Sequence, residues 1–187
     1  MEKKNSVFIA TSLDGYIADS KGGIDFLDTY PDINTIDTGY TSFTSNIDAF
    51  VFGRTTYETV LGFDIEWPYT KPVFVISNSL EIIPENLVGK VHLLNGPIKQ
   101  ILDKIHQQGH FRLYIDGGKL IQSFLAEDLI DEMVITVIPI LLGGGSSLFG
   151  SLETELKFEC IKTTLYLDSI VQNHFRRKRP IIKTPSS

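Results

Sequence analysis

The sequence has one cysteine, no long apolar run and no excess of positive charge. With Cys160 alone, an intrachain disulfide framework and a CxxC metal site are both excluded. The longest apolar stretch, residues 134–142, includes Thr136 and Pro139 and is far shorter than the ~20 residues that span a bilayer. We therefore expect a cytoplasmic protein that does not act at a membrane.

The deficit of positive charge is larger than the net charge of −6 indicates. The run from Arg176 to Arg179 holds four of the 17 basic residues, which leaves 13 against 23 acidic residues in the rest of the chain. This excess of acidic residues repels the phosphate backbone of a nucleic acid, so nucleic acid is not an expected partner. Any bound phosphate has to be held locally, by helix N-termini and a few placed cations.

At 187 residues and 42% hydrophobic, the chain has the size of one globular domain. We expect this domain at residues 1–178 and a disordered tail at residues 179–187. Short β-branched runs that predict strands lie at residues 6–10, 49–52, 72–77, 91–94, 113–115 and 133–138. Helical spacing follows Pro97 and Gly118, and the pair Thr55 and Glu58 has the spacing of a capping box.

The last forty residues differ, because residues 157–162 and 170–177 predict two antiparallel strands with no helix between them. The expected fold class is α/β, with a mostly parallel central sheet flanked by helices and an antiparallel C-terminal edge in a single domain. Residues 32–46 carry a helical stripe among poor helix formers and predict either a mobile helix or a loop over a site. We expect Cys160 in the core and residues 176–179 at a solvated strand edge.

The junction Gly53-Arg54-Thr55-Thr56 is the first candidate site. A helix that starts directly after a buried strand points free N–H groups outward, and Arg54 adds a fixed cation. This combination suits an anionic phosphate. An ordinary capped helix with a solvated arginine is the alternative.

Two glycines form the second candidate site, between Asp116 and Lys119. Gly117 and Gly118 let the backbone approach a ligand closely, although neither a GxGxxG fingerprint nor a P-loop is present. A structural tight turn is the alternative. Asp116 argues against phosphate at its own side chain but could meet a ribose hydroxyl.

Two further loops follow predicted strands. Ser77 and Asn78 place small polar groups at a strand end, where open α/β sheets bind ligands, and a plain loop is the alternative. Asp14-Gly15 is a common turn dipeptide, and it predicts either a structural turn or a loop over a bound cofactor.

Candidate proton donors are Asp25, Asp28 and Asp32, in a segment punctuated by glycine and proline. For each of them a solvated acidic loop is the alternative. The four histidines show no HExxH-like spacing and no GxSxG elbow occurs, so the sequence predicts neither a metal site nor serine-hydrolase chemistry.

Taken in their order along the chain, these motifs resemble the dihydrofolate-reductase-like family. The similarity is greatest to the branch of the C-terminal reductase domain of bifunctional riboflavin-biosynthesis proteins, here as a stand-alone domain without a deaminase motif. It spans about residues 5–178. The segments that carry it are Ser12–Ala18, Gly53–Glu58, Val75–Ser77, Ile115–Gly118 and Ile130–Gly145 with Leu148-Phe149.

The resemblance implies NADPH as cofactor and hydride transfer to a small heterocyclic substrate. That substrate would be pterin-like or of the ribosylaminopyrimidine type, as in a 5-amino-6-(5-phosphoribosylamino)uracil reductase. A homodimer through the C-terminal strands is also implied. The implied cofactor-binding positions are Ala10, Asp14, Gly15, Gly53, Arg54, Thr55, Thr56, Ser77, Asn78, Gly117, Gly118 and Lys119.

One departure from the family concerns the substrate side. Dihydrofolate reductases have a Trp followed by the acid that serves pterin protonation, whereas this chain has Phe26 in the corresponding stretch and no acid that aligns. A non-catalytic NADP(H)-binding module that has lost the proton-donating acid is therefore the alternative function.

Overall fold

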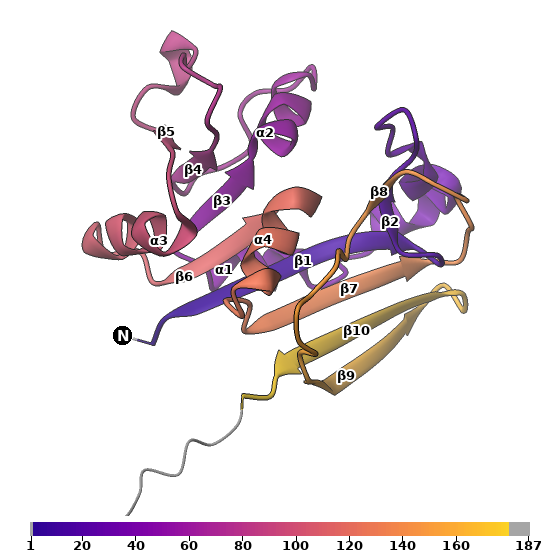
Figure 1. Cartoon of the computed structure of the whole chain (residues 1–187). Coiled ribbons are helices and arrows are strands. Elements are labelled where there is room, and N and C mark those ends of the chain that lie inside the picture. The colour runs from indigo at the N-terminus through magenta and orange to yellow at the C-terminus, as the bar shows by residue number, and fades with distance from the viewer. Residues whose placement is uncertain (1, 180–187) are drawn as a thin grey trace, which may run out of the picture.

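The computed structural model describes residues 2–179, which form one α/β domain around an eight-stranded sheet (Figure 1). The strand order is β5-β4-β3-β6-β1-β7-β10-β9, and the pairs from β5 to β7 are parallel, while β10 pairs antiparallel with β7 and β9. This arrangement confirms the expected fold class. The strands of the sheet are β1 (Lys4–Ser12), β3 (Ala49–Gly53), β4 (Val73–Ile76), β5 (Val91–Leu94), β6 (Arg112–Asp116), β7 (Glu132–Ile138), β9 (Phe158–Tyr166) and β10 (Ile170–Arg177).

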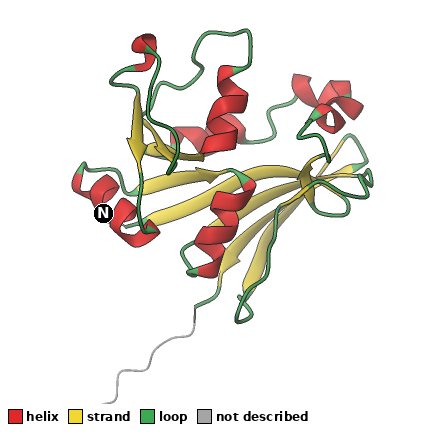
Figure 2. Ribbon diagram, turned by 45° about the horizontal axis from the view of Figure 1, so that its top comes forward, coloured by secondary structure: helices red, strands yellow, loops and turns green. Residues whose placement is uncertain are grey.

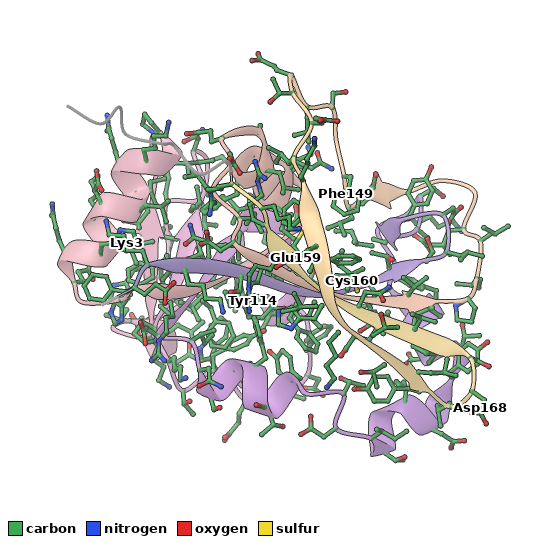
Figure 3. All side chains as sticks on the ribbon, turned by 90° about the horizontal axis from the view of Figure 1, so that it is seen from below. Lys3, Tyr114, Phe149, Glu159, Cys160 and Asp168 are labelled. Carbon is green, nitrogen blue, oxygen red and sulfur yellow. The ribbon has the colours of Figure 1, made fainter. Side chains whose placement is uncertain are left out.

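Helices cover both faces of the sheet (Figure 2). They are α1 (Tyr40–Ser45), α2 (Arg54–Leu61), α3 (Ile98–Gln107) and α4 (Gly118–Ala126). Strand side chains alternate between the two faces, so Leu113 and Ile115 pack with α3 and α4, whereas Tyr114 packs on the other side with Phe43 of α1 and Tyr57 of α2. Figure 3 shows Tyr114 on the side of the sheet that faces α1. Because both faces are covered, β3 and β4 consist almost entirely of apolar residues.

This placement of the helices creates a point where the chain reverses direction across the sheet. The crossover through α2 carries the chain from β3 to β4, and the crossover through α4 carries it the opposite way, from β6 to β7. Right-handed crossovers in opposite directions lie on opposite faces of a sheet. The neighbouring strands β3 and β6 are therefore followed by helices on different faces, which is the position where open α/β sheets bind ligands.

Some elements differ from the expectation. The prediction of a capping box at Thr55 and Glu58 is wrong. Helix α2 already begins at Arg54 with Gly53 as N-cap, and Glu58 pairs with Arg54 instead of capping the helix. Residues 32–46 form neither one helix nor one loop, since Gly39 adopts φ 91° at the start of α1. Elements that the patterning missed are the 3-10 helices Asp25–Thr29, Pro31–Thr35 and Glu85–Leu87 and a small ribbon of β2 (Tyr16–Ala18) and β8 (Ser146–Ser147).

The C-terminal region corrects two expectations. The basic run does not lie on an edge strand, because β10 pairs on both sides and β9 is the outer strand, although the side chains of Arg176, Lys178 and Arg179 are exposed. Arg177 has a side chain only 6% exposed, and it pairs with Asp128 at 2.6 Å. Cys160 is exposed rather than in the core because it lies on β9 (Figure 3).

The tail expected at residues 179–187 lies outside the described residues except for Arg179, which pairs with Asp131 at 2.6 Å. Within residues 2–179, no helix is long and apolar enough to cross a membrane.

Candidate functional site

The carboxyl ends of β3 and β6 lie side by side, with Phe52 opposite Asp116 in the register. Helix α2 begins directly after β3, and helix α4 begins directly after β6. The N-caps of both helices are glycines, Gly53 and Gly117, and neither helix has a side-chain cap. Two helix N-termini therefore present uncapped N–H groups and positive dipole ends at one place, which favours an anion.

The two turns touch each other through Gly117. Its φ is 109°, a conformation that other residues rarely adopt, and a Cβ there would lie 2.7 Å from Thr56 Oγ1 of α2. A Cβ on Gly118 would lie 2.8 Å from Ile17 Cδ1 of β2. Glycine is thus required at position 117, whereas a side chain at position 118 would need the end of the Ile17 side chain to move. Both glycines pack closely against protein atoms, and their approach to a ligand stays a prediction.

The structure also brings Arg54 to the loop that follows β4. Arg54 Nη1 donates to Ser79 Oγ at 2.8 Å, while its Nε donates to Glu58 Oε1 at 2.6 Å, and both groups are exposed. Ser77 Oγ accepts the backbone N–H groups of Ser79 and Leu80, which closes the turn that contains Asn78. The segments after β3 and β4 therefore meet at Arg54, and the turn after β6 contacts α2 through Gly117. Lys119 is exposed on the first turn of α4.

The predicted loop after β1 is held by Asp14. Its carboxylate accepts hydrogen bonds from Ser12 Oγ at 2.6 Å and from the backbone N–H groups of Leu142 and Gly143. The Ser12 hydrogen bond is the main reason that the pKa of Asp14 is lowered. Gly15 adopts φ 84°, and its carbonyl accepts the N–H of Leu148. Asp14 thus fixes the loop to the glycine turn after β7, next to the end of β1 that carries Ala10.

Asp116 is the carboxyl group at this site whose pKa is most changed by its environment, whereas the sequence predicts for it only a contact with a ribose hydroxyl. The side chain lies on the α1 and α2 side of the sheet, because it follows Tyr114 by two residues in β6. Oδ1 accepts the N–H of Gly117 at 2.9 Å. Burial raises the pKa of Asp116 to about 6, which brings a carboxyl group into the range where it can exchange protons near neutrality.

Aromatic side chains pack on the same face of the sheet as this carboxyl group. Tyr114 lies 5.0 Å from Phe43 and 6.4 Å from Tyr40 between ring centroids, and Tyr69 lies 5.1 Å from Phe52. Burial raises the pKa of Tyr40 to about 12, and the pKa values of Tyr69 and Tyr114 are raised as well. The charge of Asp116 contributes to all three shifts, so the phenols lie within its electrostatic reach.

Comparison with known families agrees with this geometry. Residues 4–171 match the model of the RibD C-terminal domain. The chain belongs to this family. A structure from Shewanella sp. PV-4, named as a candidate riboflavin biosynthesis protein, is 52% identical, covers 94% of this chain and 99% of its own, and has a TM-score of 0.90. The uncharacterised protein YwjB of Bacillus subtilis strain 168 is 36% identical over 95% of this chain and 99% of its own length.

The RibD C-terminal fold is related to that of dihydrofolate reductase. A dihydrofolate reductase from Enterococcus faecalis complexed with NADP(H) aligns with 94% of this chain and 97% of its own at a TM-score of 0.65, with 13% identity. The expected resemblance is therefore confirmed for family and fold. The cofactor, the substrate and the roles of single residues remain predictions for this chain.

The three carboxylates predicted as proton donors lie elsewhere in this RibD-type domain. Asp25, Asp28 and Asp32 are exposed on 3-10 turns. Apolar residues of the same turns pack on Ile138 and Ile170, at the end of β7 and the start of β10. Two steps along the sheet separate β7 from β6, which carries Asp116. The three acids thus lie on turns that pack against β7 and β10, whereas the aromatic cluster packs around β6 and β3.

The basic C-terminal run lies at the opposite, amino edge of the sheet. There a hollow of about 440 Å³ is lined by Lys3, Lys4 and several of these arginines together with acidic residues. Lys4 and Arg176 both pair with Glu132, at 2.6 and 3.2 Å. Glu132 of β7 thus links β1 to β10 at this edge of the sheet. Among residues 2–179, no group of three or more His, Cys, Asp or Glu side chains is arranged to hold a metal ion.

Proposed function

We propose that this RibD C-terminal domain is an NADPH-dependent reductase that transfers a hydride to a small nitrogen heterocycle. The observation that carries the proposal is the meeting of two uncapped helix N-termini at the carboxyl ends of β3 and β6. A dinucleotide has two adjacent phosphates that need such N–H groups and little else. Because acidic residues outnumber basic ones in the rest of the chain, a phosphate has to be bound by such local N–H groups.

The residues present fit such a cofactor. The Gly53–Thr56 turn and the Gly117–Lys119 turn would hold the pyrophosphate through their backbone N–H groups. We expect Arg54, Ser77 and Asn78 to meet a 2′-phosphate, which would favour NADPH over NADH, and the Arg54–Ser79 hydrogen bond supports this by joining the two turns that carry them. Asp14 and Gly15 would hold the loop beside the nicotinamide, next to Ala10. When bound, reduced nicotinamide supplies the hydride.

The protein then has to orient the substrate and deliver a proton. Addition of a hydride to the carbon of a C=N bond leaves a negative charge on nitrogen, which one proton neutralises. Asp116 is the group best suited to this step, because its raised pKa keeps part of the population protonated near neutral pH. Asp25, Asp28 and Asp32 remain alternative donors, directly or through an oriented water.

The non-catalytic NADP(H)-binding module is the competing function. It was motivated by the lack of an aligned acid, and Asp116 weakens that reason by supplying an acid from another strand. The two functions differ in one measurable way: a binding module takes up NADPH but does not oxidise it in the presence of any pterin or aminouracil.

Two measurements on the same sample test the proposal. Calorimetric titration with NADPH should give saturable binding, and a Kd above ~1 mM would contradict the cofactor assignment. NADPH oxidation followed by absorbance, with a panel of pterins and ribosylaminouracils, should then detect turnover. Binding without any turnover would favour the non-catalytic module.

A further inference from the structure

Helix α1 is held less firmly than the other three helices of the domain. None of its residues is buried, whereas α2, α3 and α4 each bury at least two. It is six residues long and consists mainly of Thr and Ser, which are poor helix formers, and its N-cap Gly39 supplies no side-chain cap. So short a helix is unstable by itself in water, and contacts from other segments have to hold it in place.

Two aromatic side chains attach α1 to the sheet. The ring of Phe43 lies 5.1 Å from that of Phe8 on β1 and 5.0 Å from that of Tyr114 on β6, between ring centroids. Tyr40 contacts the same two rings at 5.4 and 6.4 Å, although it is 39% exposed. These contacts place α1 over β1 and β6, and polar groups then fix its two ends.

The C-terminal end of α1 is closed by Lys71, which lies before β4 and far from α1 in the sequence. Its Nζ donates to the carbonyl oxygens of Thr44 at 2.5 Å, Ile47 at 2.6 Å and Ser45 at 3.0 Å. An ammonium group has three N–H donors, so all of them are used here. The last carbonyl groups of a helix lack partners within it and carry the negative end of its dipole, so a cation binds them well.

The entry to α1 is held by Gln172 of β10, and four strands of the sheet lie between β10 and β4. Its Nε2 donates to the Thr38 carbonyl oxygen at 3.2 Å and to Thr136 Oγ1 of β7 at 2.9 Å. Gln172, Thr136 and Ala10 are aligned in register across β10, β7 and β1. Residues 38–47, which we call the strap, therefore cross one face of the sheet and are tied down at both ends.

We propose that the strap opens away from the sheet as one unit, and that Lys71 is the residue that holds it closed. A segment with few buried contacts opens at a lower free energy than the whole domain does. Opening uncovers the rings of Phe8 and Tyr114 and gives a small molecule access to the face of the sheet on which Ala10 lies. The strap goes beyond the proposed function by adding a conformational step that does not depend on NADPH binding.

Amide hydrogen exchange, measured without added cofactor at several low urea concentrations, tests the opening. In the unmodified protein the amides of α1 should exchange at least about tenfold faster than the slowest amides of α3, with little dependence on urea, because local opening exposes little surface. Equal protection of α1 and α3 would overturn the inference, since the strap would then open only on global unfolding. With NADPH left out, this outcome is separate from the outcome of the cofactor titration.

Two variants show whether Lys71 holds the strap closed. Lys71→Met keeps a side chain of similar length without its charge and donors, and it should lower the protection of α1 about tenfold or more. Asp128→Asn is the control, because it weakens the pair with Arg177 at the amino edge of the sheet, and Asn tolerates the φ of 53° at this position. This control should lower the protection of α3 but leave that of α1 within about twofold.

Either of two results would overturn the role of Lys71. One is unchanged protection of α1 in Lys71→Met, which would mean that the three hydrogen bonds do not limit the opening. The other is an equal loss of protection in α1 and α3 in Asp128→Asn, which would mean that both exchange through unfolding of the whole domain.

A thiol on the covered face of the sheet tests access. Thr136 is 6% exposed and contacts Gln172, and Cys160 is the single native cysteine. In a Cys160→Ser background, the thiol introduced by Thr136→Cys should react with N-ethylmaleimide about tenfold faster when Lys71→Met is added. A reaction rate that does not change with Lys71→Met would show that the strap does not control access, and it would overturn the inference.

Discussion

At the scale of a single residue, the burial of Asp116 has two effects. It raises the pKa of the carboxyl group, which suits proton exchange, and it lowers the stability of the folded protein when the group is ionised. Burial raises its pKa to about 6, against about 3.9 in an unfolded chain. The folded protein therefore binds this proton more tightly than the unfolded chain does. Between pH 4 and 6 stability falls as the pH rises, and above pH 6 the whole cost is present.

Asp116→Asn should for this reason stabilise the protein at neutral pH. A shift of about two pKa units sets an upper limit near 3 kcal/mol, and partial exposure reduces the expected gain to about 1–2 kcal/mol at pH 7. At about pH 3 the gain should almost vanish, because the carboxyl group is then mostly protonated in both the folded and the unfolded state. Urea unfolding at the two pH values measures this, with Asp25→Asn as an exposed control. A loss of stability at pH 7 would show that Asp116 is already satisfied within the fold.

At the scale of elements, the candidate site depends on the contact between the turn before α4 and the first turn of α2. Gly117→Ala places a Cβ against Thr56 Oγ1 and imposes φ 109° on a residue with a side chain. We expect a loss of about 2–4 kcal/mol in unfolding free energy and weaker NADPH binding, because α2 must move away from α4.

The double variant Thr56→Ala/Gly117→Ala separates the two causes. Removal of the hydroxyl should recover the part of the loss that comes from the clash, and the part due to φ should remain at about 1–2 kcal/mol. Strictly additive effects in denaturant unfolding would mean that the two turns are not in contact.

A second element-scale prediction concerns Asp48, which joins the start of β3 to the start of β6. Its carboxylate accepts the N–H groups of Phe111 and Arg112 and pairs with the Arg112 guanidinium at 2.6 Å. Burial opposes ionisation of Asp48, but these hydrogen bonds outweigh it and lower its pKa to about 2. The stabilisation is then fully present above pH 4 and is lost as the pH falls from about 4 to 2.

We expect Asp48→Asn to reduce the free energy of unfolding by about 1–3 kcal/mol at pH 7 and by little at pH 2. Thermal unfolding as a function of pH gives the comparison, and Asp64→Asn, an exposed loop carboxylate, is the control. An equal loss at both pH values would contradict the assigned hydrogen bonds.

Strand identity could be read from the sequence, whereas side-chain partners could not. Runs such as Val73–Ile76 and residues 49–52 are apolar because both faces of these strands are covered, so local composition alone predicts them. The two glycine turns were predictable for the same local reason. Arg177 and Asp116 were not, because the partner or the environment of each comes from distant segments: Asp128 lies 49 residues from Arg177, and Tyr40 lies on α1. The prediction that Cys160 lies in the core was wrong for a similar reason, since its burial depends on which strand lies at the edge of the sheet.

For the whole molecule, the expected homodimer through the C-terminal strands remains a prediction. The outer strand β9 exposes Leu165 to 58% and Ile161 to 38%. Apolar groups on an edge strand favour pairing with a second copy. Leu165→Lys should shift the protein toward monomer in light scattering, whereas Ile82→Lys, at a residue 78% exposed in a loop, should not. A protein that is monomeric without any substitution at micromolar concentration would remove the prediction.

We propose that this acidic chain binds NADPH at the carboxyl ends of β3 and β6, with Arg54 at the 2′-phosphate. The most direct test is the NADPH affinity of Arg54→Gln compared with Lys104→Gln, which removes an exposed cation on α3. We expect Arg54→Gln to weaken NADPH binding about tenfold or more and to reduce the preference for NADPH over NADH, while Lys104→Gln changes the Kd less than about twofold. Equal effects of the two substitutions would mean that the cofactor binds elsewhere.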